Sequence, residues 1–263
     1  MNLEVEYNNR ARVPGHPAII GEWMRDAAAF RAAHPPEVLA YGPGPREAMD
    51  LFLPREIRGV AMFFHGGYWQ ALDRSSASHC AAGLLAHGIA VGVPSYDLCP
   101  GVPLVRIVDQ AEAAARALHA RLGRPMLIAG HSAGGQLSAM LLARLPVEIA
   151  AAALSISGVF WLEPLVTTSL NVALGLDEAG ARALSPALLP SPGRPLHCAV
   201  GGAESDEFLR QSREFATLWG GTWEALPGLD HFTVLAPLSR PDHPLTITGT
   251  RLARQACGEL SVA

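Results

Sequence analysis

Apolar runs of strand length alternate with helix-like segments along most of the chain. The runs end at Gly, Pro or polar residues, which is typical of buried strands. Strands are predicted over 58–65, 89–96, 125–131, 148–157, 194–202 and 222–226, and helices over 75–87, 103–122, 133–145 and 205–219. This alternation predicts an α/β fold in which a mostly parallel central sheet carries helices on both faces.

Residues 159–193 interrupt the alternation, since they are rich in Leu, Pro and Thr. We expect a small cap insertion there, over the carboxyl edge of the sheet, where such folds bind their ligands. No composition shift is strong enough to divide the chain, so residues 1–263 are predicted to form a single domain.

Charge and cysteine usage exclude several classes of partner. The net charge is −4 and no block of Lys or Arg occurs, so we expect no nucleic acid and no anionic membrane as a partner. The stretch 149–162 is too short to span a bilayer, and the first ten residues do not form a secretory signal. The four cysteines form no CxxC pair, which predicts no metal site and a cytoplasmic protein with reduced thiols.

The segment GHSAGG, residues 130–135, has the form G-x-S-x-G between a predicted strand and a predicted helix. In that context the motif presents a nucleophilic serine on a tight turn, which makes Ser132 the candidate nucleophile. The alternative is a glycine-rich turn that has no chemical role.

A serine nucleophile needs a base and an acid that follow it in the chain. His231 lies in the segment LPGLDHFTVL, after the last predicted strand, and is the candidate base. The acid should follow the strand over 194–202, where Glu204 and Asp206 are both candidates. Ser205 suits a helix N-cap, which would place Asp206 in the first turn and leave Glu204 as the last loop residue. We therefore favour Glu204, with Asp206 as the alternative.

The segment HGGYW, residues 65–69, follows an early predicted strand. Its glycines leave the backbone N–H groups open to a reacting oxygen, as an oxyanion hole requires. Gly66 and Gly67 are the candidate donors, together with Ala133, which follows the nucleophile.

These residues together resemble the α/β-hydrolase fold and, within it, the kynurenine formamidase (arylformamidase) family. The likeness extends through YNNRARVPGHP (7–17), HGGYW, YDLCP (96–100), SISGVFWLEPL (155–165), LSPALLP (184–190) and ESDEFLRQS (204–212) to DHFTVL (230–235). Animal members carry an aspartate at the position that matches Glu204. We expect residues 1–36 to pack near the mouth of the active site.

The resemblance implies a cofactor-independent serine hydrolase that cleaves an N-formyl arylamine, in the family case N-formyl-L-kynurenine, to the amine and formate. Its small-molecule substrate would meet an aromatic pocket, for which the candidates are Tyr68, Trp69, Phe160, Trp161 and Phe232. Ordinary core packing is the alternative for these rings. A carboxylesterase or arylesterase that uses the same triad on small acyl esters, and a non-catalytic ligand-binding member of the fold, are the alternative functions. The sequence leaves a homodimer open.

Overall fold

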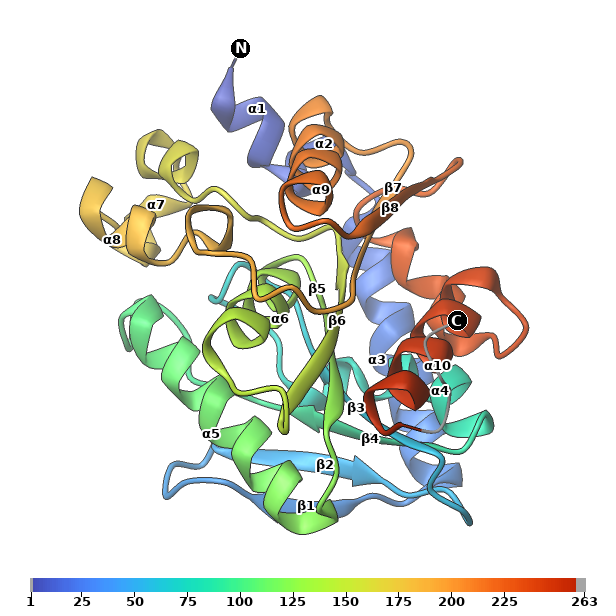
Figure 1. Ribbon diagram of the computed structural model, residues 1–263. Coiled ribbons are helices and arrows are strands. Elements are labelled where there is room, and N and C mark those ends of the chain that lie inside the picture. The colour runs from blue at the N-terminus through green and yellow to red at the C-terminus, as the bar shows by residue number, and fades with distance from the viewer. Residues whose placement is uncertain (1, 259–263) are drawn as a thin grey trace.

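The computed structural model describes residues 2–258, which contain one eight-stranded sheet (Figure 1). Its strands are β1 (Glu37–Ala40), β2 (Ala48–Phe52), β3 (Gly59–Phe64), β4 (Ile89–Pro94), β5 (Met126–His131), β6 (Ala150–Ile156), β7 (Leu196–Gly201) and β8 (Thr222–Leu226). They lie in the order β1-β2-β4-β3-β5-β6-β7-β8. Strands β3 to β8 run parallel to one another. Strand β2 pairs with both β1 and β4 in antiparallel fashion. The predicted α/β fold is confirmed.

Helices cover both faces of this sheet, with α5 and α6 on one side and α3, α4 and α10 on the other (Figure 1). The α-helices are α1 (Leu3–Tyr7), α2 (Asn9–Arg12), α3 (His16–Ala33), α4 (Ala82–Ala86), α5 (Leu104–Leu122), α6 (Ala133–Arg144), α7 (Asn171–Leu174), α8 (Glu178–Ala183), α9 (Asp206–Leu218) and α10 (Pro244–Ala256). Short 3₁₀ turns, η1 to η5, occupy Arg74–Ser76, Ser78–Ala81, Glu163–Thr167, Pro186–Leu188 and Thr233–Ser239.

Strand β3 shows how the two-residue period of a strand divides the core. Val60, Met62 and Phe64 join the apolar cluster that also contains residues of α5 and α6. Ala61 and Phe63 point to the opposite side and join the cluster under α3, α4 and α10. Because both faces are covered, every residue of β3 is buried, which explains its continuous apolar run.

Several elements differ from the prediction. The helix predicted over 75–87 is two 3₁₀ turns followed by the short helix α4. Strands β1 and β2 and helices α3 and α10 were not predicted. In β2 the apolar run is broken by Asp50, which is fully buried and forms ion pairs with Arg31 and Arg74. A charge in a buried strand is tolerated only with such partners.

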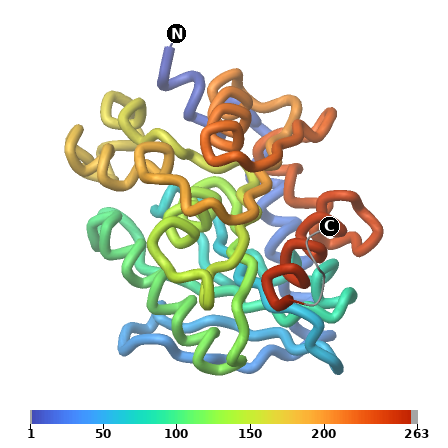
Figure 2. The backbone as a smooth tube through the Cα atoms, in the orientation of Figure 1, coloured from blue at the N-terminus to red at the C-terminus, as the bar shows by residue number. Residues whose placement is uncertain are grey.

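The N-terminal segment lies against helix α9 above the carboxyl edge of the sheet (Figure 1). Figure 2 shows the blue N-terminal segment beside the orange helix α9, and α1 contacts both α9 and the turn η3. Residues 159–193 fold into short helices and turns on the same end of the molecule (Figure 1). Among residues 2–258, we find no helix with the length and apolar character needed to cross a membrane.

Candidate active site

Ser132 stands on a sharp turn between β5 and α6. Its backbone has φ 55° and ψ −115°, a strained conformation for a residue with a side chain. The flanking glycines make the turn feasible. A Cβ on Gly130 would lie 2.2 Å from the carbonyl oxygen of Gly134, and a Cβ on Gly134 would lie 2.1 Å from that of Phe64. The motif therefore packs backbone against backbone and exposes the serine at the strand end.

His231 reaches both other members of the predicted triad. Its Nε2 lies 3.0 Å from Ser132 Oγ, within hydrogen-bond distance of the hydroxyl proton. Its Nδ1–H donates to Oε2 of Glu204 over 2.6 Å. The imidazole is nearly buried, and the ring of Phe208 packs edge-on against it at 4.8 Å. These bonds fix the tautomer in which Nε2 can take a proton from Ser132.

The structure brings Glu204 to His231 and leaves Asp206 in solvent. Oε1 of Glu204 accepts hydrogen bonds from Ser157 (2.5 Å) and from the N–H of Gly201 (2.7 Å), so the buried carboxylate is fully bonded. Asp206 is exposed at the first position of α9, where Ser205 caps the helix.

The loop after β3 places backbone donors beside the nucleophile. A Cβ on Gly66 would lie 2.9 Å from Nδ1 of His131 and 3.2 Å from Cβ of Ser132, so only glycine allows this approach. Within residues 2–258, the N–H groups of Gly66 and Gly67 donate to no other protein atom. The N–H of Ala133 opens helix α6 and so has no intrahelical partner. These donors can face an oxygen bound at Ser132.

The same loop is held in an unusual conformation. Tyr68, Trp69 and Leu72 all have positive φ, at 50°, 56° and 72°. Each costs roughly 1–2 kcal/mol relative to ordinary backbone. Contacts with Tyr96 stabilise the loop. The ring of His65 stacks on that of Tyr96 at 4.2 Å, and the Tyr96 hydroxyl donates to the carbonyl of His65 over 2.8 Å.

A cleft of about 470 Å³, including its open mouth, lies over Ser132. Its walls are Asn9, Arg10, Ile20, Trp23, Gly66, Gly67, Tyr68, Leu72, His131, Ser132, His231 and Phe232. Two of the five rings predicted for the pocket, Tyr68 and Phe232, line it.

The other three predicted rings lie elsewhere, which corrects the expected pocket. Trp69 is fully buried in the core. Phe160 stacks on Phe215 at 4.0 Å, and Trp161 lies beneath the guanidinium of Arg210 at 5.3 Å. Core packing, the alternative considered for these rings, accounts for their positions.

One wall of the cleft consists of Asn9, Arg10, Ile20 and Trp23, which were not among the site residues predicted from the sequence. Trp23 packs against His131 and Phe232, with ring centroids 6.1 and 6.0 Å apart. Only the expectation that residues 1–36 pack near the mouth followed from the sequence, and the segment YNNRARVPGHP (7–17) contains only Asn9 and Arg10 of this wall.

Histidines near the cleft are held neutral by burial. Burial, and then the neighbouring His231, lower the pKa of His131 well below its usual range, and its Nε2–H donates to the carbonyl of His231 over 2.8 Å. Burial also lowers the pKa of His65 to about 4 and that of His79 to about 4.

These shifts predict that acid weakens the fold. His65 and His79 stay neutral in the folded chain, whereas in the unfolded chain they protonate near pH 6.5. Between pH 6.5 and 4 the unfolded chain therefore binds more protons, and stability falls as the pH falls. At pH 5 we expect each histidine to contribute a loss of roughly 2 kcal/mol relative to neutral pH. Urea unfolding at the two pH values measures the loss, and a His79→Gln variant should lose about 2 kcal/mol less than the wild type. Equal losses in the two proteins would contradict the assignment.

No cluster of His, Cys, Asp or Glu suited to a metal ion occurs within residues 2–258. The functional groups at the cleft are a serine hydroxyl, an imidazole hydrogen-bonded to a carboxylate, and backbone N–H donors. They suit nucleophilic acyl transfer.

Comparison with known proteins agrees with the fold. A sequence family described as the alpha/beta hydrolase fold matches residues 61–188. A crystal structure from Silicibacter sp. TM1040, provisionally described as a thioesterase, is 35% identical and covers 95% of this chain and 99% of its own, with a TM-score of 0.90. The chain belongs to the α/β-hydrolase fold family, and it is a hydrolase.

Within that family the chain resembles kynurenine formamidase, as the sequence motifs indicated. The kynurenine formamidase of Salmo salar is 28% identical over 229 residues, which are 78% of this chain and 78% of that protein. An esterase from Pyrobaculum calidifontis is 17% identical with a TM-score of 0.73, covers 92% of this chain and 93% of its own, and shares the fold.

Proposed function

We propose that the protein hydrolyses an N-formyl arylamine, N-formyl-L-kynurenine in the first instance, to L-kynurenine and formate. The observation that carries the proposal is the hydrogen-bonded chain Ser132–His231–Glu204 at the base of the cleft. The likeness to kynurenine formamidase over 78% of the chain supports the choice of substrate.

In the first half of the proposed reaction, Ser132 Oγ attacks the formyl carbon. His231 Nε2 takes the hydroxyl proton, and Glu204 stabilises the imidazolium that forms. The oxyanion accepts hydrogen bonds from the N–H groups of Gly66, Gly67 and Ala133. Each such donor can lower the barrier by roughly 3–4 kcal/mol in a dry site. The C–N bond then breaks, and His231 returns the proton to the departing arylamine.

In the second half, water attacks the formyl ester of Ser132. His231 removes a proton from the water, the same donors hold the second oxyanion, and the Ser132 oxygen leaves with the proton from His231. Formate is released and the serine hydroxyl is restored.

An ester or thioester substrate would use the same atoms. The 35% identity to a protein provisionally described as a thioesterase favours this second candidate, which includes the small-acyl esterase predicted from the sequence. Substrate identity therefore depends on the leaving group that the cleft accepts.

A comparison of kcat/KM separates the two functions. We expect N-formyl-L-kynurenine to exceed p-nitrophenyl acetate and a short acyl thioester, because the cleft combines aromatic walls with polar groups at its mouth. Formamide cleavage that does not rise above background, beside rapid ester or thioester cleavage, would exclude the formamidase function. The cytoplasmic location and a homodimer stay predictions from the sequence.

A further inference from the structure

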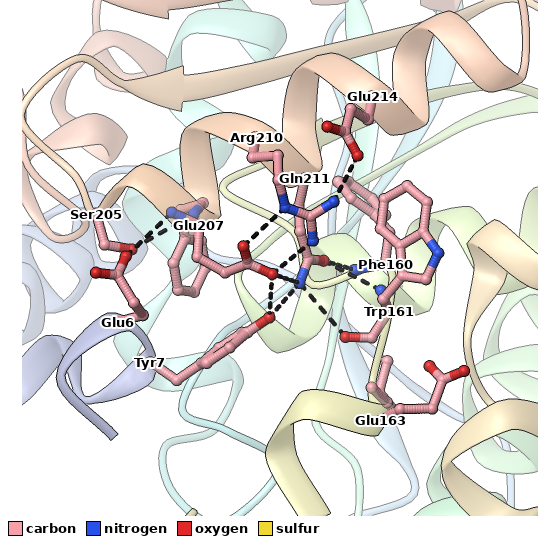
Figure 3. A network of polar contacts seen from close by, with 12 residues as sticks. Glu6, Tyr7, Phe160, Trp161, Glu163, Ser205, Glu207, Arg210, Gln211 and Glu214 are labelled. Carbon is pink, nitrogen blue, oxygen red and sulfur yellow. Dashed lines mark hydrogen bonds and ion pairs between the residues drawn. The ribbon is translucent and has the colours of Figure 1, made fainter. Parts of the chain in front are cut away.

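The N-terminal segment, residues 2–12, is fastened to helix α9 by a buried polar network (Figure 3). The Tyr7 hydroxyl donates to Oε1 of Glu207 over 2.7 Å and accepts from Nε2 of Gln211 over 2.5 Å. Arg210 binds the same carboxylate at 2.6 Å. Because Glu207 and Gln211 are almost fully buried, these bonds hold the segment in one position.

The same segment also bonds to both loops of the catalytic site. The Tyr68 hydroxyl, from the oxyanion loop, donates to the carbonyl of Tyr7 over 2.6 Å. Nη2 of Arg12 donates to the carbonyl of Glu204 over 3.3 Å. Residues 9 and 10 lie between these attachments and are thereby placed at the cleft.

The side-chain amide of Asn9 has no hydrogen-bond partner within residues 2–258. Asn9 is 2% exposed, and neither Oδ1 nor Nδ2 of its amide has a hydrogen-bond partner. It lines the cleft over Ser132 and the hollow that adjoins it. A buried amide without partners is costly, so a ligand that offers it a donor and an acceptor gains the bonds the protein lacks.

Arg10 places a positive charge at the same mouth. It is exposed, lines both the cleft and the adjoining hollow, and forms no hydrogen bond or ion pair with other residues in the range 2–258. The nearby acids are engaged elsewhere, since Glu4 binds Ser169 and Glu6 accepts from the N–H of Glu207. The guanidinium is free to pair with an anion on a substrate.

We propose that Asn9 and Arg10 determine specificity in this site, and that Arg10 gives it a preference for aryl formamides that carry a carboxylate over neutral ones. Arg10 pairs with the carboxylate at the mouth, and the Asn9 amide bonds to the polar groups next to the scissile bond. This inference rests on the proposed function, since it names the residues that would select the substrate cleaved by the same Ser132.

The role of Arg10 is tested by comparing kcat/KM for an anionic and a neutral formamide. The substrates are N-formyl-L-kynurenine and formanilide, which has no carboxylate. Arg10→Gln should lower kcat/KM about tenfold for the anionic formamide, mainly through KM, and change formanilide less than twofold. Arg10→Lys should restore part of the loss. Arg25→Gln, which removes another exposed charge outside the cleft, should change kcat/KM for neither substrate. Equal effects of Arg10→Gln on both substrates, or none on either, would overturn the role of Arg10.

Asn9→Leu separates recognition from structure. Because it removes two unsatisfied polar atoms at similar volume, Tm should stay constant or rise, while kcat/KM for both formamides falls about tenfold or more. A lowered Tm with unchanged kcat/KM would show that Asn9 serves the fold and would overturn its role in recognition.

A matched ester pair distinguishes failure of this inference from failure of the proposed function. If the wild type cleaves esters but neither formamide, the formamidase proposal is wrong. The Arg10 inference is then judged on 4-acetoxybenzoate against phenyl acetate. A preference for the anionic ester that Arg10→Gln removes supports the carboxylate site, and an unchanged ratio rejects it.

Discussion

The Ser132→Ala variant should lose turnover by a factor on the order of 10⁶ in kcat and still fold normally. Without the hydroxyl, His231 has nothing to deprotonate, and water would have to attack the substrate directly. The donors of Gly66, Gly67 and Ala133 remain, so some rate above the uncatalysed reaction should persist. The expected loss is large because Ser132, His231 and Glu204 act as one unit.

Stability measurements provide the control for that variant. Ser132 Oγ bonds to His231 and to no other side chain among residues 2–258, so its removal should leave Tm almost unchanged. A fluorophosphonate probe should label the wild type and not the variant. An active Ser132→Ala protein would remove Ser132 from the mechanism.

Glu204→Gln should reduce kcat by about 10³- to 10⁴-fold. An amide can bond to Nδ1 of His231, but it does not stabilise the imidazolium and does not enforce the tautomer that leaves Nε2 free. The substitution also changes the bonds to Ser157 and to the N–H of Gly201, so circular dichroism and Tm should accompany the kinetics.

Asp206→Asn is the matched control, since it neutralises the other carboxylate considered for the triad. Asp206 is exposed and lies at the start of α9, where its charge favours the helix N-terminus. We expect kcat within twofold of the wild type. A severe loss in Asp206→Asn together with an active Glu204→Gln would reverse the assignment.

Features that depend only on neighbouring residues in the chain, such as turns, helix caps and buried strands, could be predicted from the sequence. The turn at Ser132 requires glycines on both sides, and the segment GHSAGG (130–135) contains them. The choice of Glu204 over Asp206 followed from the expectation that Ser205 caps α9, which the structure contains. Buried parallel strands appear as continuous apolar runs, so β3 through β7 were predicted close to their observed limits.

The elements that were not predicted depend on distant partners. Strand β1 is largely exposed and short, so it has no apolar pattern. Strand β2 contains Asp50, whose charge is tolerated only because Arg31 and Arg74 meet it in the folded chain.

Three of the five rings predicted for the pocket lie outside the cleft. The sequence shows that aromatic residues lie next to the catalytic motifs, but it does not show whether each ring faces the cleft or the core. Phe160 stacks on Phe215 in the core, whereas Trp23 of helix α3 lines the cleft.

The attachment of residues 2–12 to α9 has a practical consequence for protein engineering. The nucleophile, base and acid come from the middle and end of the chain, whereas Asn9 and Arg10 come from its first dozen residues. A mutant library confined to those first codons could alter which leaving group is accepted without touching the catalytic groups.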